Sequence, residues 1–188
     1  MQGPVIAALI AASVTAIGWL VTHILTRRSE EQRRRTEVQL KFVERQIEEL
    51  YGPLAFLLHE GRRTFEDLLD ALGRQYVFEG DDPLPEHELK TWLYWVETEF
   101  LPRNERIKSL LMSKTHLVDG PVFPESYIAF LDHANSWAIN HRRWKEQRVK
   151  YSWHSKINWP TEFEREALDA FKRLNAKHSK LLGDLEPA

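Results

Sequence analysis

The stretch Leu20–Leu40, LVTHILTRRSEEQRRRTEVQL, changes from apolar to densely charged residues with no proline or glycine at the boundary. Because neither half contains a residue that stops a helix, we predict one uninterrupted helix across it. The change in chemistry falls between Thr26 and Arg27. We therefore expect the first part of this helix to lie in an apolar environment and the second part to lie in water.

The apolar stretch Pro4–Thr26 contains no Asp, Glu, Lys or Arg over its 23 residues. A helix of this length spans about 34 Å, compared with about 30 Å for the hydrocarbon core of a bilayer. One alternative is a cleaved signal peptide, which should begin with basic residues that the start MQGP lacks. The other is a buried core helix. We predict a transmembrane helix over residues 1–26.

The orientation of this helix follows from arginines that come directly after the apolar stretch, whereas no basic residue precedes it. They are Arg27, Arg28, Arg33, Arg34 and Arg35. Positive charge stays on the cytoplasmic side of a membrane. We therefore predict a single-pass protein of the bacterial inner membrane, with its N-terminus outside and its C-terminal domain in the cytoplasm.

Small residues recur every four positions along the apolar stretch, at Ala8, Ala12 and Ala16. Such a face lets helix backbones approach closely in lipid and favours self-association, although alanine is also simply common in single transmembrane helices. If several helices surround a pore, Thr15, Thr22 and His23 are the polar side chains that would line it.

A heptad pattern follows the arginines, with residues spaced alternately by four and three positions. Its members are Thr36, Leu40, Val43, Ile47, Leu50, Leu54 and Leu57. The pattern predicts an amphipathic helix that packs on its own domain or on copies of itself. Pro53, preceded by Gly52, predicts a kink. We predict a juxtamembrane stalk helix over residues 27–52 and a cytoplasmic helical bundle over residues 53–188.

Beyond the stalk, four-residue apolar spacing predicts helices separated by turns, and no stretch predicts a strand convincingly. The predicted helices run from Pro53 to about Tyr76, from about Glu86 to His116 with a kink at Pro102, from Pro124 to about Lys150, and from Thr161 onward. Thr161 and Glu164 predict a capping box at the start of the last helix. The predicted fold class is all-α: a single transmembrane helix, an amphipathic stalk and a helical bundle.

Several kinds of chemistry lack their sequence signals. The chain has no cysteine, which excludes disulfides and thiolate metal sites. It contains no HExxH, P-loop, GxGxxG or GxSxG motif. No Glu or Asp precedes a His by three positions, as di-metal helical bundles require. We therefore predict no metal, no cofactor and no small-molecule substrate.

One helical stripe in the region 127–151 combines aromatic residues with a histidine and an arginine. Its members are Tyr127, Phe130, Ala134, Trp137, His141, Trp144, Arg148 and Tyr151. Polar groups on a buried face need partners. His141 and Arg148 therefore indicate a functional site or an ion pair. The alternatives are a satisfied core histidine for His141 and a solvated helix end for Arg148.

The segment His141–Trp159 is rich in Lys and Arg, which alternate with aromatic residues. Basic residues bind phosphates, and aromatic rings stack on bases or lie at bilayer interfaces. The segment is a candidate binding patch for lipid headgroups or for RNA, and a merely solvated helix end is the alternative. The members of the candidate patch are Arg142, Arg143, Trp144, Lys150 and Trp153.

In length, in its apolar N-terminus and charged stalk, and in a helical body with a late Arg and His pair, the chain resembles the small membrane-anchored effectors of type VI-B CRISPR systems. The resemblance implies a HEPN-like helical fold, a ring-shaped membrane pore and an RNA-guided nuclease as partner. HEPN ribonucleases carry Arg, four to six residues and then His. The sequence RVKYSWH places Arg148 and His154 at that spacing, and RLNAKH does the same for Arg173 and His178.

These observations lead to hypotheses of different classes. The favoured one is a membrane-anchored homo-oligomer whose pore permeabilises or depolarises the inner membrane in antiviral defence. The competing one is a membrane-tethered HEPN-type ribonuclease, in which Arg148 stabilises charge and His154 acts as general acid or base. A third is a scaffold that binds lipid or RNA through its basic aromatic segment.

Overall fold

The computed structural model describes residues 3–78, 84–149 and 158–186, with side chains described from Ile17 onward. Every regular element in these ranges is a helix and none is a strand, which confirms the all-α prediction. The chain divides into two units. Met1–Val43 and Lys177–Ala188 form the first unit, and Glu44–Ala176 forms the second.

Helix α1 covers Gly3–Gln46, so the chain continues as one helix across the charge boundary. The charged part of α1 carries ion pairs at four-residue spacing, between Glu31 and Arg35 and between Arg33 and Glu37. Exposed pairs of this kind each stabilise a helix by about 0.3–0.5 kcal/mol. The charged half of α1 is therefore supported by its own side chains.

The predicted localisation, a single-pass protein of the inner membrane, is contradicted. Within the described residues, no helix has a segment that is both long enough and apolar enough to cross a membrane. Side chains are described for residues 17–26 of the apolar stretch, about 15 Å of helix, whereas a hydrocarbon core is about 30 Å thick. The side chains of residues 1–16 are outside the described part of the chain. They include those of four predicted site residues: Ala8, Ala12, Thr15 and Ala16.

A π-helical turn, η1 (Ile47–Tyr51), joins α1 to α2 (Gly52–Leu72). The backbone N–H of Gly52 donates to the carbonyl of Ile47, five residues earlier. Pro53, which has no N–H to donate, then lies in the first turn of α2, where none is needed. The wider turn thus takes the helix past the proline, at the position where the sequence predicts a kink.

The same arrangement occurs before Pro102. Helix α3 (Glu86–Trp95) passes into a second π-helical turn, η2 (Val96–Phe100), and then into α4 (Leu101–Ser113). The N–H of Leu101 donates to the carbonyl of Val96, again across five residues. Both ends of η2, Val96 and Phe100, are buried, so the turn also faces the core.

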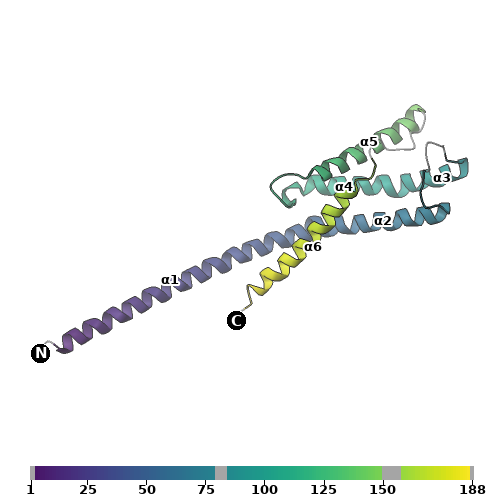
Figure 1. Ribbon diagram of the computed structural model, residues 1–188. Coiled ribbons are helices and arrows are strands. Elements are labelled where there is room, and N and C mark those ends of the chain that lie inside the picture. The colour runs from purple at the N-terminus through teal and green to yellow at the C-terminus, as the bar shows by residue number, and fades with distance from the viewer. Residues whose placement is uncertain (1–2, 79–83, 150–157, 187–188) are drawn as a thin grey trace. The chain divides into compact units, whose positions relative to one another are not determined.

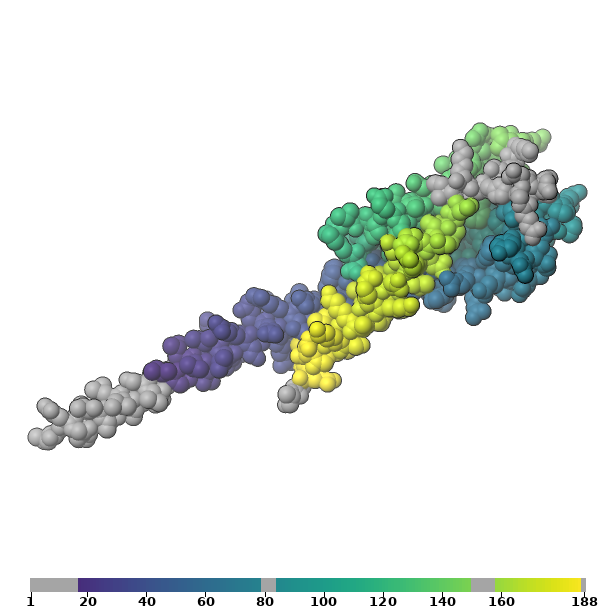
Figure 2. Space-filling model, in the orientation of Figure 1, coloured from purple at the N-terminus to yellow at the C-terminus, as the bar shows by residue number. Residues whose placement is uncertain are grey.

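In the second unit, α2, the α3–α4 segment and α5 (Glu125–Gln147) run side by side in alternating directions (Figure 1). Gly73, with a φ of 65°, ends α2 in the left-handed conformation that glycine adopts most easily. The short helix η3 (Thr115–Leu117) follows α4. Helix α6 (Thr161–Gly183) begins against α5 (Figure 2).

Apolar and aromatic packing holds these helices together. One core cluster is centred on α3 and η2 and consists of Leu68, Val77, Leu84, Trp92, Val96 and Phe100. A second contact joins α5 to α6, where Phe163 stacks on Phe130 with their centroids 4.5 Å apart. The predicted aromatic stripe of α5 faces inward, since its members from Tyr127 to Trp144 are buried or half-buried.

Replacing Gly52 with alanine should destabilise the second unit. An added Cβ would lie 2.8 Å from the backbone oxygen of Ile47, so the π-helical turn must shift. Overpacking of this kind costs about 1–3 kcal/mol. Urea unfolding should show a lower midpoint for Gly52→Ala. The control Gly183→Ala, where a Cβ meets nothing within 4 Å, should not lower it. Equal midpoints for Gly52→Ala and the wild type would contradict the prediction.

The carboxylate of Glu49 accepts hydrogen bonds from Arg45 Nε at 2.9 Å and Lys114 Nζ at 2.7 Å. These bonds lower the pKa of Glu49 from 4.5 to about 2. Because the folded pKa is the lower one, the stabilisation is present above about pH 4.5 and is lost as the pH falls towards 2. When the pH is lowered from 6 to 3, the free energy of unfolding, measured with urea, should therefore fall further for the wild type than for Glu49→Gln. An equal loss would refute this.

Candidate ligand-binding pocket

A cavity of about 430 Å³ lies within the second unit, among α2, the α3–α4 segment, α5 and the start of α6. Pockets that bind small molecules typically have volumes of about 300–1,000 Å³. Most of the wall is apolar, and six of its side chains are aromatic: Phe65, Phe78, Trp92, Phe100, Trp137 and Trp159. The cavity therefore has the size and lining of a site for a small organic molecule.

The aromatic wall is built around Trp92. Its ring lies nearly parallel to that of Trp137, with centroids 5.9 Å apart, and Phe78 meets it edge-on at 5.2 Å. Phe100 is tilted against both tryptophans, at 5.8 and 6.0 Å. Aromatic pairs prefer these offset and edge-on arrangements. The wall is thus a set of rings that hold one another in place.

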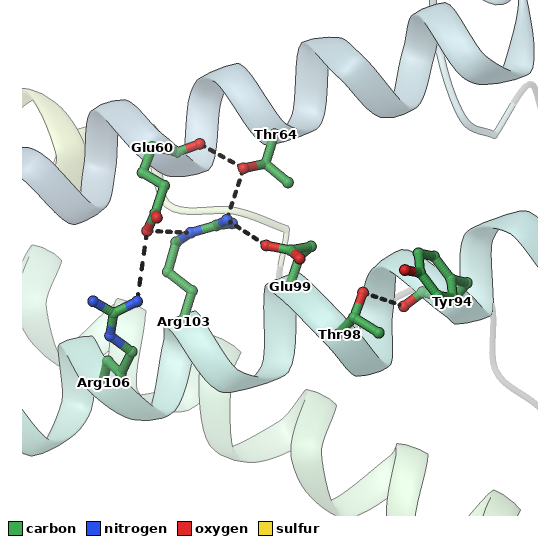
Figure 3. A network of polar contacts seen from close by, with 7 residues as sticks. All are labelled: Glu60, Thr64, Tyr94, Thr98, Glu99, Arg103 and Arg106. Atoms are coloured by element: carbon green, nitrogen blue, oxygen red, sulfur yellow. Dashed lines mark hydrogen bonds and ion pairs between the residues drawn. The ribbon is translucent and has the colours of Figure 1, made fainter.

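Arg103 is the buried cation of the pocket, with only 6% of its surface exposed. Its guanidinium donates to Thr64 Oγ at 2.8 Å and to Glu60 Oε2 at 3.4 Å, both on α2, and to Glu99 Oε2 on η2 at 3.5 Å (Figure 3). The hydroxyl of Thr64 in turn donates to the carbonyl of Glu60 at 2.7 Å. A buried charge needs such partners, because it has lost its water.

Two neighbours complete the surroundings of Arg103. Its guanidinium carbon lies 6.0 Å from the centre of the Phe100 ring, within the range of a cation–π interaction. On the α2 side, a Cβ on Gly61 would come within 3.3 Å of Arg103 Cδ. The glycine therefore gives the arginine side chain the room that it needs beside α2.

A second cation of the wall, Arg62, forms an ion pair with Glu164 of α6. The carboxylate of Glu164 also accepts a hydrogen bond from Trp159 Nε1 at 3.1 Å. The described side-chain bonds of Glu164 thus run to the pocket residues Arg62 and Trp159, whereas the sequence predicts a capping box with Thr161. Glu164 links α2 and α6 across one side of the pocket.

Two buried donors in residues of the wall have no partner among the described atoms: Trp92 Nε1 and Asn104 Nδ2. An unsatisfied buried donor costs about 1–3 kcal/mol. His133, also in the wall, is buried edge-on between Trp137 and Trp159, at 5.5 and 5.7 Å. Burial of these polar groups around the pocket therefore lowers the stability of the second unit.

His141, which the sequence assigns to a site, an ion pair or a satisfied core position, is buried and paired. Its Nε2 donates to Glu97 Oε1 at 3.1 Å, and Lys145 Nζ donates to the same oxygen at 3.0 Å. The Lys145 hydrogen bond, assisted by His141, lowers the pKa of Glu97, although partial desolvation opposes it. This interaction connects α5 to η2 and lies outside the pocket lining.

The structure describes only one residue of the predicted catalytic pair, Arg148. Arg148 is exposed at the C-terminal end of α5, in a left-handed conformation with a φ of 53°. His154 lies outside the described residues. In the other candidate pair, Arg173 donates to Asp119 Oδ2 at 3.2 Å, and His178 belongs to the other unit. The catalytic roles stay predictions.

The described members of the predicted basic and aromatic patch differ in exposure. Arg142 and Arg143 are exposed, and Arg143 Nε donates to Gln147 at 3.3 Å. Trp144 is half-buried, packs against the core cluster and lies 5.3 Å from the His141 ring. Lys150 and Trp153 lie outside the described residues. Trp144 thus belongs to the packing of α5 rather than to an open stacking surface.

The two described residues of the predicted pore lining, Thr22 and His23, are exposed on α1. The hydroxyl of Thr22 donates to the carbonyl of Gly18 at 2.9 Å. The His23 ring stacks on Trp19 with a centroid distance of 5.3 Å. Both contacts are local to one helix, and the pore-lining role stays a prediction.

The pocket is not predicted by the sequence, although the apolar spacing places much of its wall on inward-facing sides of the helices. One signal was available at Arg103, which continues the spacing of Val96 and Phe100 towards Ile107 by four, three and four residues. A cation on an apolar stripe indicates a buried polar contact. No known protein family, curated protein or solved structure matches the chain. The resemblance to type VI-B CRISPR effectors therefore stays a prediction.

Replacing Arg103 with methionine should destabilise the second unit by about 1–3 kcal/mol, because buried hydrogen bonds to a charged group are lost. The control Arg106→Met removes an exposed ion pair to the same Glu60, 3.7 Å long. That change should cost at most about 1 kcal/mol. Urea unfolding of both variants measures the difference. A loss for Arg106→Met as large as that for Arg103→Met would contradict the prediction.

Proposed function

We propose that the second unit, residues 44–176, is a binding domain for a small, largely apolar aromatic molecule. The observation that carries the proposal is the cavity of about 430 Å³ with six aromatic side chains in its wall. Such cavities with few polar groups are the usual sites for organic ligands. The sequence predicts no small-molecule substrate, because it lacks the motifs of catalytic and nucleotide-binding sites. Its apolar spacing indicates which side chains face inward and not whether they fill the interior.

The wall supports binding in two ways. Its rings are held by contacts with one another, so little side-chain freedom would be lost when a ligand enters. A flat aromatic ligand would also gain ring contacts in addition to the burial of its apolar surface. For a two-ring molecule we expect a dissociation constant on the order of 10–100 µM.

The polar groups of the wall support binding rather than catalysis. Both arginines of the wall, Arg62 and Arg103, already have carboxylate partners. A catalytic role for either would require that it leave those partners. The ribonuclease, RNA scaffold and self-association hypotheses stay predictions of the sequence, and the described residues add no contact in their favour.

Titration with 2-naphthylmethanol tests the proposal, with calorimetry as the readout. Phe65→Ala should weaken binding about five- to tenfold, since it removes a ring from the wall that is worth about 1–1.5 kcal/mol. Phe65 is 42% exposed, so the protein should still fold. The matched control is Phe56→Ala on the same helix, which is 65% exposed and outside the lining, and which should leave binding unchanged.

Two results would overturn the proposal. One is the absence of measurable binding up to the solubility limit of 2-naphthylmethanol. The other is equal binding by the wild type and Phe65→Ala, which would place the probe elsewhere on the chain. A circular dichroism spectrum and a thermal melt of each variant establish that the fold is retained.

A further inference from the structure

From the charges of the wall, we infer that the pocket selects neutral ligands, and that Glu164 and Glu60 exclude anions by neutralising Arg62 and Arg103. This inference rests on the proposed function and names the chemical class of its ligand. An arginine in an apolar pocket would ordinarily attract a carboxylate or phosphate. Here the carboxylates are supplied by the protein itself.

The guanidinium of Arg103 donates to oxygens on two sides, Thr64 and Glu60 of α2 and Glu99 of η2. An anionic ligand would have to displace one of these carboxylates or lie close to both. In a partly dehydrated pocket, the repulsion between like charges is stronger than in water. Arg103 therefore gives an anion no net attraction.

In the ion pair between Arg62 and Glu164, the carboxylate is the more buried member. The side chain of Glu164 is 14% exposed, whereas that of Arg62 is 59% exposed. The carboxylate thus lies on the inner side of the pair and the cation on the outer side. The indole N–H of Trp159 also donates to this carboxylate, so that donor is used as well. A ligand in the pocket meets the negative member of the pair first.

A cationic ligand is disfavoured for the converse reason. It would give up its water in an apolar cavity whose wall already contains the buried cation Arg103. The carboxylates that could receive it are already engaged by Arg62 and Arg103. Burial of a charge without a partner of its own is unfavourable. The remaining class is a neutral aromatic molecule.

Three probes with the same ring system test this selection in the full-length wild-type chain at pH 7: 2-naphthylmethanol is neutral, 2-naphthoate is an anion and 2-naphthylmethylammonium is a cation. The alcohol should bind at least about tenfold more tightly than either charged probe. Calorimetric titration at two salt concentrations measures the preference. Tighter binding of either charged probe, or equal binding of all three, would overturn the inference.

The role of Glu164 is tested by Glu164→Gln, which keeps the shape of the side chain and leaves Arg62 without its carboxylate. The affinity for 2-naphthoate relative to that for the alcohol should rise about tenfold. The control Glu162→Gln lies on the same helix, where Glu162 pairs with Arg165 outside the lining, and it should change neither. Glu60→Gln, which acts on Arg103, is a second variant with the same expected direction.

The outcomes separate this inference from the proposed function. If none of the three probes binds, the proposed function fails and the inference fails with it. If the alcohol binds in the pocket but the charged probes bind equally well, only the inference fails. If Glu164→Gln and Glu60→Gln both fold, as thermal melts establish, and both leave the weak binding of 2-naphthoate unchanged, the two carboxylates do not exclude anions.

Discussion

The arrangement of α2 and α4 depends on the hydrogen bonds that the buried guanidinium of Arg103 donates to α2. A charge removed from water is stable only where acceptors surround it, and α2 supplies two of them, Glu60 and Thr64, one helical turn apart. A shift of α2 by one turn along α4 would take both acceptors away from the guanidinium. Apolar burial has no direction, so leucine contacts alone would not fix this register.

The fixed register also explains why a cavity persists between these helices. Rings such as Trp92, Phe100 and Trp137 are rigid and already hold one another in offset or tilted contacts. They cannot close onto the space beside them without breaking those contacts. Gly61 leaves room at the point where Arg103 crosses α2. The polar network and the aromatic wall therefore support the same open volume.

A π-helical turn accommodates each of two prolines in the helices. Pro53 and Pro102 each follow a π-helical turn, η1 and η2, in which the residue before the proline donates to a carbonyl five residues earlier. Because proline cannot donate and its ring crowds the preceding turn, a regular α-helix would bend or break there. The wider turn lets the chain continue as a helix. In η2 it also brings Val96 and Phe100 into the core that forms the pocket.

The sequence by itself determined the helical class and much of the inward face. The spacing of Leu40, Leu50 and Leu54 predicted burial correctly, because helical periodicity directly reflects which side chains point the same way. Only the tertiary structure decided the partners of Arg103, the ion pair between Glu164 and Arg62, and the existence of the cavity. Each brings together residues from helices that are distant in sequence. The spacing within one helix does not encode the separation between two.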